Sequence, residues 1–403
     1  MIILLLVYKS LRHHLVSTLV SAIAIALAGG LLMAVWVMKD EANRTFTGVT
    51  GGFDAVLGAR SSKLQLVLNA IFHLEDSPGN IAAADIEAIQ KNPSVELALP
   101  IAVGDNYQGY RLVGTTPDVF TRVEYAPGRH YEILAPGRAF GEGQFEAVVG
   151  SFAAEKLGLK PGDTFHPFHG LIFDEAKQHS ETYVVTGVLA PTSTPTDRVI
   201  WIPISGVQRM SGHDPKTATD ASAVLVKLKA SSPMSGFQLD MLYNKRGNRL
   251  TFAWPIGSIL GKLFDKIAWF DRILAFISYL VVVVATASIL ASIYNSMNER
   301  RREIAILRAL GAQRVTVFSA IVVESAAIAA LGMVIAFFIY GAVVVVASEI
   351  IRSQTGVVID PLKFHLVMLV APAGIISLSA LLGIFPAFKA YRTDVASGLS
   401  PVS

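Results

Sequence analysis

The sequence predicts a membrane protein with four transmembrane helices and a large extracytoplasmic mixed α/β domain inserted between helices 1 and 2. The first observation is composition: 52% of the 403 residues are hydrophobic and only 16% are charged, whereas soluble chains carry roughly 25% charged residues. The second is a set of four long apolar segments. The third is the stretch between the first two segments, which has the strand and turn pattern of a folded domain.

Each apolar segment exceeds the roughly 20 residues that a helix needs to cross a bilayer. The third is longer than necessary, so we expect it to tilt or to extend into water. The first has a longer apolar core than a signal peptide and lacks a clean cleavage motif, which favours an uncleaved anchor. Basic residues gather before the first span, between the second and third, and after the fourth. The positive-inside rule therefore places these three regions in the cytoplasm.

The predicted order follows from these spans and their orientation. It is a cytoplasmic N-terminus (1–14), a first span (15–38), a periplasmic core domain with a stalk or interfacial helix (39–270), a second span (271–296), a cytoplasmic coupling segment (297–314), a third span (315–348), a short periplasmic loop (349–364), a fourth span (365–388) and a cytoplasmic tail (389–403). We expect the protein to be a multi-pass protein of the bacterial inner membrane, with its large domain in the periplasm.

The large external segment predicts a mixed domain with short strands and few helices. Residues 85–91 form a short amphipathic pattern that ends before Asn92-Pro93, and residues 95–103 read as a strand. The stretch "EAVVGSFAAEKLGLKPGDTFHPF" reads as strand, short helix, turn and strand. No G-x-S-x-G, H-E-x-x-H or dinucleotide-binding glycine pattern is present. We therefore predict a non-catalytic chain.

The cysteine content and net charge do not indicate a bound cofactor or nucleic acid. There is no cysteine, which excludes disulfides and thiolate-bound zinc. The net charge of +3 is too small to indicate nucleic acid. Three histidines stand close in sequence, His166, His169 and His179, and three imidazoles can make an open zinc site. Turn histidines are the simpler interpretation, so we predict no metal site and keep these three as the alternative.

Residues 298–315 read NERRREIAILRALGAQRV, a highly charged helix between two apolar spans. Ile304, Leu307 and Leu310 form one apolar stripe, and Gly311 is a plausible end of the helix. Positive-inside arginines on an interfacial helix would explain the charge. The ordered stripe is not explained in this way, and it favours a helix that docks in a groove of a soluble partner.

Glu324 lies about two turns into the third span. A carboxylate within a membrane span is a functional candidate by default. The interpretation that we favour is structural: a side chain that caps neighbouring helices or pairs with a loop arginine such as Arg314.

The stretch "NERRREIAILRALGAQRVTVFSAIVVESAAIAALG" at 298–332 resembles the signature of the FtsX-like permease family. These are the membrane subunits of ABC systems that include MacB and the LolC/LolE lipoprotein exporters. The resemblance covers about 276–396 and ends with "GIFPAFKAYRTDVASGLSP". In the outer segment, "VVGSFAAEKLGLKPGDTF" followed by "YVVTGVL" is similar to the periplasmic core domain of the family.

The resemblance implies a mechanotransmission role, in which ATP-driven closure in the cytoplasm moves the outer domain. It implies a second permease copy, so that the permease is a homodimer. It also implies two cytoplasmic ATPase subunits that bind ATP and Mg. The ATPase is expected as a separate chain, because no Walker motif is present here. Membrane lipid and a periplasmic or outer-membrane protein are further expected partners. Carried onto this chain, the ATPase-coupling residues are Glu299, Arg300, Arg301, Arg302, Glu303, Leu307, Arg308, Leu310 and Gly311.

The predicted function is the permease subunit of an ABC complex that exports or extracts a hydrophobic or lipid-linked cargo, or that drives efflux. One alternative is an FtsX-like signal transmitter that activates a periplasmic partner such as a cell-wall hydrolase. A second alternative is a component of a periplasmic metal-handling system, which depends on the histidines. The large outer domain favours transport, because a minimal signalling module needs less chain.

Overall fold

The computed structural model of the protein describes residues 2–212, 219–230, 234–299, 311–360 and 363–392. The chain divides into two compact units. The helical unit consists of Met1–Ala42, Ile267–Ser348 and Asp360–Ser403, and the globular unit consists of Asn43–Lys266 and Glu349–Ile359. The short second piece of the globular unit comes from the segment predicted to link the third and fourth spans.

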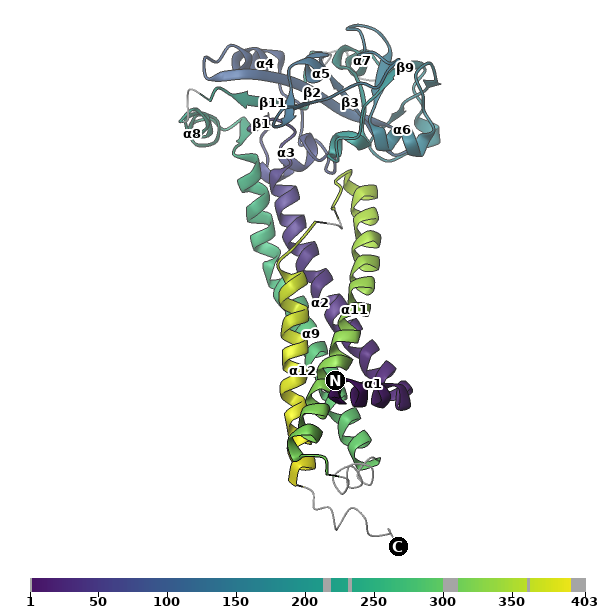
Figure 1. Cartoon of the computed structure of the whole chain (residues 1–403). Helices are drawn as coiled ribbons and strands as arrows, with labels where there is room; N and C mark the ends of the chain where they lie inside the picture. The colour runs from purple at the N-terminus through teal and green to yellow at the C-terminus, as the bar shows by residue number, and fades with distance from the viewer. Residues whose placement is uncertain (1, 213–218, 231–233, 300–310, 361–362, 393–403) are drawn as a thin grey trace. The chain divides into compact units, whose positions relative to one another are not determined.

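Long helices build the helical unit (Figure 1): α2 covers Leu15–Gly48, α9 covers Ile256–Glu299, α11 covers Arg314–Thr355 and α12 covers Val367–Arg392. In the part of the chain that the structure describes, α2, α11 and α12 are long and apolar enough to cross a membrane. The pieces Ile256–Lys266 and Ala268–Val284 of α9 add a fourth span if they act as one. The chain is therefore a multi-pass membrane protein, while the count of four spans stays a prediction.

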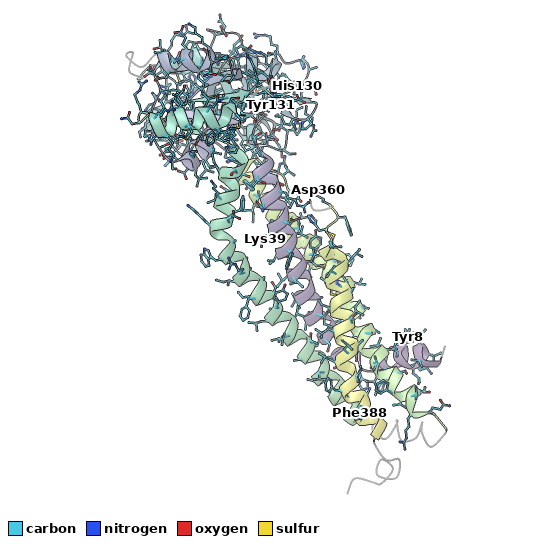
Figure 2. All side chains as sticks on the ribbon, turned by 90° about the vertical axis from the view of Figure 1, so that its left-hand side faces the viewer. Tyr8, Lys39, His130, Tyr131, Asp360 and Phe388 are labelled. Carbon is cyan, nitrogen blue, oxygen red and sulfur yellow. The ribbon has the colours of Figure 1, made fainter. Side chains whose placement is uncertain are left out.

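The outward faces of these helices are apolar, as expected of helices in lipid. Phe338 of α11 is 74% exposed and Leu381 of α12 is 60% exposed. Figure 2 shows the polar residues Lys39 and Asp360 near one end of the helical unit, and Tyr8 and Phe388 towards the other. A short helix that the sequence analysis missed, α1 (Ile2–His13), precedes α2.

Small residues let α2 and α11 pack closely. A Cβ atom added to Gly332 would lie 2.8 Å from the carbonyl oxygen of Ala22, and one added to Gly30 would lie 2.9 Å from that of Ala336. Ala26 and Met33 of α2 are fully buried in the same apolar cluster. Lipid tails are as apolar as these side chains, so close packing and dispersion hold such helices together.

A twisted mixed sheet forms the globular unit, with the strand order β12-β1-β11-β2-β3-β10-β6-β9-β7 among the described residues and β8 paired to β2. The strands are β1 (Ala55–Ala59), β2 (Val95–Tyr107), β3 (Tyr110–Thr115), β6 (Glu146–Val149), β7 (Thr164–Phe165), β8 (Phe168–His169), β9 (Tyr183–Val188), β10 (Ile200–Pro203), β11 (Ala223–Leu228) and β12 (Leu250–Ala253). A separate hairpin pairs β4 (Glu124–Ala126) with β5 (Arg129–His130).

The long strand β2 joins the two halves of this sheet. Its first half pairs antiparallel with β11, and its second half pairs antiparallel with β3 and β8. The pairing shifts register between Val103 and Asn106, an irregularity that lets the strand bend and redirects its side chains. Asp105 lies within this irregular stretch.

Short helices pack around the sheet, and two of the elements predicted from the sequence can be compared with them. They are α3 (Lys63–Ala70), α4 (Ala83–Gln90), α5 (Asp118–Thr121), α6 (Ser151–Leu157), α7 (Ile204–Gln208) and α8 (Ser235–Asp240), with further short turns at Glu175–Lys177, Pro195–Arg198 and Met241–Arg246. The predicted helix at 85–91 is confirmed as α4 with a small shift. The predicted strand, helix, turn and strand at 146–165 are confirmed as β6, α6 and β7.

Candidate functional site

The last turns of α11 belong to the globular unit. The guanidinium carbon of Arg352 lies 5.1 Å from the centre of the Phe152 ring, a cation–π distance. Its Nη2 is 3.3 Å from Oε2 of Glu155. Both partners lie on α6, and Arg198 also donates a hydrogen bond to the carbonyl oxygen of Gln354. These contacts lie within the globular unit and hold the last turns of α11 in it.

A glycine and an apolar residue complete this attachment. Gly356 has a φ of 76°, the left-handed conformation that favours glycine at the end of a helix. A Cβ atom there would lie 2.8 Å from the carbonyl oxygen of Thr194. Val357 is fully buried in the main hydrophobic cluster of the globular unit. Residues 349–364 were predicted as a short loop, but α11 continues to Thr355. Contacts of Arg352 with Glu155 and of Gln354 with Arg198 stabilise these last turns.

An ion-pair cluster, in which Glu41 and His365 are buried, joins α2 to the residues just before α12. Nζ of Lys363 lies 2.8 Å and 2.9 Å from the two carboxylate oxygens of Glu41, whose side chain is only 7% exposed. His365 lies beside them, with Nδ1 3.4 Å from Oδ2 of Asp40 and Nε2 3.6 Å from Oε2 of Glu41. Removing Lys363 would leave the buried carboxylate of Glu41 without this cation, which is unfavourable because a buried charge needs a partner. This cluster therefore links α2 to the residues that immediately precede α12.

Glu324 lies near the other end of the helical unit, where it contacts α1. The hydroxyl of Ser10 donates a hydrogen bond to its Oε1. Ser10 belongs to α1 and Glu324 to α11, so the carboxylate links two helices. The role of Glu324 stays a prediction.

The predicted coupling residues stand largely outside the described part of the chain: Arg300, Arg301, Arg302, Glu303, Leu307, Arg308 and Leu310. The two flanking residues are described. Glu299 is the last residue of α9. Gly311 has a φ of 98°, and α11 begins three residues later at Arg314. In the chain, the predicted coupling segment therefore lies between α9 and α11.

Two of the three candidate histidines meet a buried carboxylate. Asp105 of β2 pairs directly with His169 of β8 in the sheet, and His179 lies shortly before β9. Nε2 of His179 is 3.2 Å from Oδ1 of Asp105, and Nδ1 of His169 is 3.4 Å from the same oxygen. One ligand atom from each of the three residues lies within 4.8 Å of the others.

The other ring nitrogen of His179 has a backbone partner, because its Nδ1 lies 2.8 Å from the carbonyl oxygen of Ser211. The hydrogen bond to Asp105 raises the pKa of His179 above its ordinary value, against the opposing effect of burial. The imidazole is thus held in one orientation by contacts on both sides.

Other histidines have different surroundings. His166 points its Nδ1 at the carbonyl oxygen of Glu181, 3.1 Å away, so it is not brought into the cluster with His169 and His179. The third member of the cluster is Asp105, a residue that was not predicted from the sequence. His73 packs edge-on against Trp201, and burial lowers its pKa to about 3, so it is a neutral core residue at physiological pH.

Comparisons with known proteins give two family matches. The FtsX-like permease C-terminal model matches residues 275–395, and the MacB-like periplasmic core domain model matches residues 15–238. The crystal structure of the periplasmic region of MacB from Actinobacillus actinomycetemcomitans is 13% identical over 54% of this chain and 94% of that chain, with a TM-score of 0.35. The extracellular domain of the noncanonic ABC-type transporter YknZ from Gram-positive bacteria is 17% identical over 49% and 99%, with a TM-score of 0.31. No curated protein matches the chain.

Proposed function

Because this chain belongs to the family of FtsX-like permeases with a MacB-like periplasmic core domain, we propose that it is the membrane subunit of an ABC complex that uses a separate cytoplasmic ATPase. The observation that carries the proposal is the pair of family matches, at 15–238 and 275–395, which together include most of the chain. Permeases of this family are generally non-catalytic, so ATP and Mg would be bound by the partner.

The proposed topology has four spans, with α9 as the second. Residues 39–270 lie in the periplasm, and the chain resides in the bacterial inner membrane as one of two copies. Charge in the short loops supports this orientation. The apolar outward faces of α2, α11 and α12 support contact with lipid.

The proposed mechanism is transmission along helices. The ATPase contacts residues 299–311 and displaces the start of α11. A regular α-helix is a stiff rod that rises about 1.5 Å per residue, and α11 is unbroken from Arg314 to Thr355. Its last turns contact α6 through Arg352, and Val357, two residues after its end, is buried in the core of the globular unit. A displacement of the coupling segment is therefore passed to the mixed domain without movement of cargo through the spans.

The mechanical work would serve export or extraction of a hydrophobic or lipid-linked cargo, or efflux with a periplasmic or outer-membrane partner. The proposal is tested by purifying the tagged full chain with its ATPase and also without it. We expect ATP turnover in the complex, and neither turnover nor ATP binding by the chain alone, because it lacks a phosphate loop. Stoichiometric ATP binding by a partner-free sample would refute the assignment as a subunit.

A further inference from the structure

We propose that Asp105, His169 and His179 form a binding site for a divalent transition-metal ion such as zinc. The inference concerns the globular unit alone and does not depend on the proposed transport function. Two imidazoles and one carboxylate are a ligand set that zinc takes in proteins, with a further position left for water or another ligand.

The backbone brings the three residues together. The β2–β8 pairing sets Asp105 directly opposite His169. His179 is held by its own backbone, because its N–H donates to the carbonyl oxygen of Pro167 at 2.9 Å and the adjacent Gln178 bridges to Phe168. The cluster is therefore part of the sheet framework, and it needs no rearrangement of the backbone to form.

Two of the three distances between ligand atoms are close to those of a metal site, and the third is at most 4.8 Å. A zinc ion bonded tetrahedrally at about 2.0–2.2 Å separates neighbouring ligand atoms by roughly 3.3–3.6 Å. Oδ1 of Asp105 lies 3.2 Å from Nε2 of His179 and 3.4 Å from Nδ1 of His169. The His169 side chain is 53% exposed, so it has room to rotate onto an ion that enters from solvent.

The hydrogen bond behind His179 selects the tautomer that a metal needs. A carbonyl oxygen only accepts hydrogen bonds, so Nδ1 carries the proton that it shares with Ser211. In a neutral ring, Nε2 then presents its lone pair towards Oδ1 of Asp105. Two lone pairs at that distance repel unless a cation lies between them. Metal-bound histidines commonly donate their second nitrogen to a carbonyl in this way.

A proton is the competing cation, because a doubly protonated His179 would form an ordinary ion pair with Asp105. The two explanations make different demands on His169. An ion pair between Asp105 and His179 is complete without it, whereas a metal site loses one of its three protein ligands when His169 is removed. The exposed side chain of His169 also makes its replacement the least harmful to the fold.

The test uses the full chain in detergent, freed of metal by chelator and titrated with zinc against a chromophoric chelator. We expect the wild type to bind one zinc ion per chain. His169→Ala should bind at least tenfold more weakly, which corresponds to about 1.4 kcal/mol. His166→Ala is the matched control, a neighbouring histidine outside the cluster, and its affinity should equal that of the wild type.

Two further measurements separate lost ligation from lost structure. Thermal unfolding of the metal-free proteins should be the same for the wild type and His169→Ala. Co²⁺ should give the visible absorption of a tetrahedral nitrogen and oxygen complex in the wild type, and this absorption should be lost in His169→Ala. Failure of the wild type to take up zinc, or equal affinities for the wild type and His169→Ala, would overturn the proposal and leave the ion pair as the explanation of the cluster.

Discussion

Replacing both Leu307 and Leu310 with alanine is expected to leave the chain inserted and dimeric but to uncouple ATP hydrolysis from external function. The two leucines lie on the apolar stripe of the charged segment, which we propose docks in a groove of the ATPase. Anchors at the centre of an interface often cost 2 kcal/mol or more when truncated. A double truncation should therefore remove most coupling, measured as ATPase co-purification, ATP turnover and complementation of a deletion strain.

Two control variants separate the loss of the apolar anchors from other effects on the segment. Leu307→Met with Leu310→Met keeps the apolar volume and should complement. Arg301→Ala, at the proposed rim, should weaken assembly mainly at high salt, since rim charges affect association rate more than affinity. If the double alanine variant assembles and complements like the wild type, the segment is only an interfacial anchor and its arginines serve topology alone.

Replacing Gly332 with leucine should severely destabilise the helical unit. A Cβ atom there would lie 2.8 Å from both the backbone oxygen of Ala22 and Cβ of Ile25. Backbone cannot move aside as the end of a flexible side chain can, so α2 and α11 would have to separate. Overpacking costs about 1–3 kcal/mol even where side chains can adjust, and here several close contacts of the same interface would be lost as well.

The chain contains a matched control for this substitution. Gly341 lies on the same helix, and a Cβ atom there would meet no atom within 4 Å. Gly341→Leu adds the same side chain with the same gain in helix propensity, and it should leave the melting temperature of the detergent-solubilised protein nearly unchanged. Equal melting temperatures for the two leucine variants would show that close packing at Gly332 contributes little.

The sequence predicted the three apolar spans that correspond to α2, α11 and α12, because hydropathy is a local property of each segment. It did not predict how far the helices extend. Polar residues after position 38, such as Lys39 and Glu41, look like the end of a span, yet α2 continues to Gly48. Helix formation does not require apolar residues, and Lys363 satisfies the buried carboxylate of Glu41 from a distant part of the chain.

The candidate site shows the same limit. His169 and His179 were visible as neighbours in sequence, but Asp105 stands more than sixty positions earlier, and only the β2–β8 register brings it to them. The attachment of Arg352 to α6 is equally non-local. An aspartate in the strand-like stretch "VGDNY", where an apolar residue is expected on the buried face, was the one available signal.

The most direct test of the proposed transmission is a nucleotide-dependent movement of the globular unit. Lys91→Cys offers a single labelling site, because the protein has no native cysteine and the Lys91 side chain is 74% exposed. Spin labels at this position, in the complex reconstituted in lipid with its ATPase, report the distance between the two copies. We expect the distance distribution to change between the nucleotide-free and ATP-bound states, and to stop responding in the Leu307→Ala, Leu310→Ala variant. An unchanged distribution in a complex that demonstrably turns over ATP would contradict transmission from the coupling segment to the globular unit.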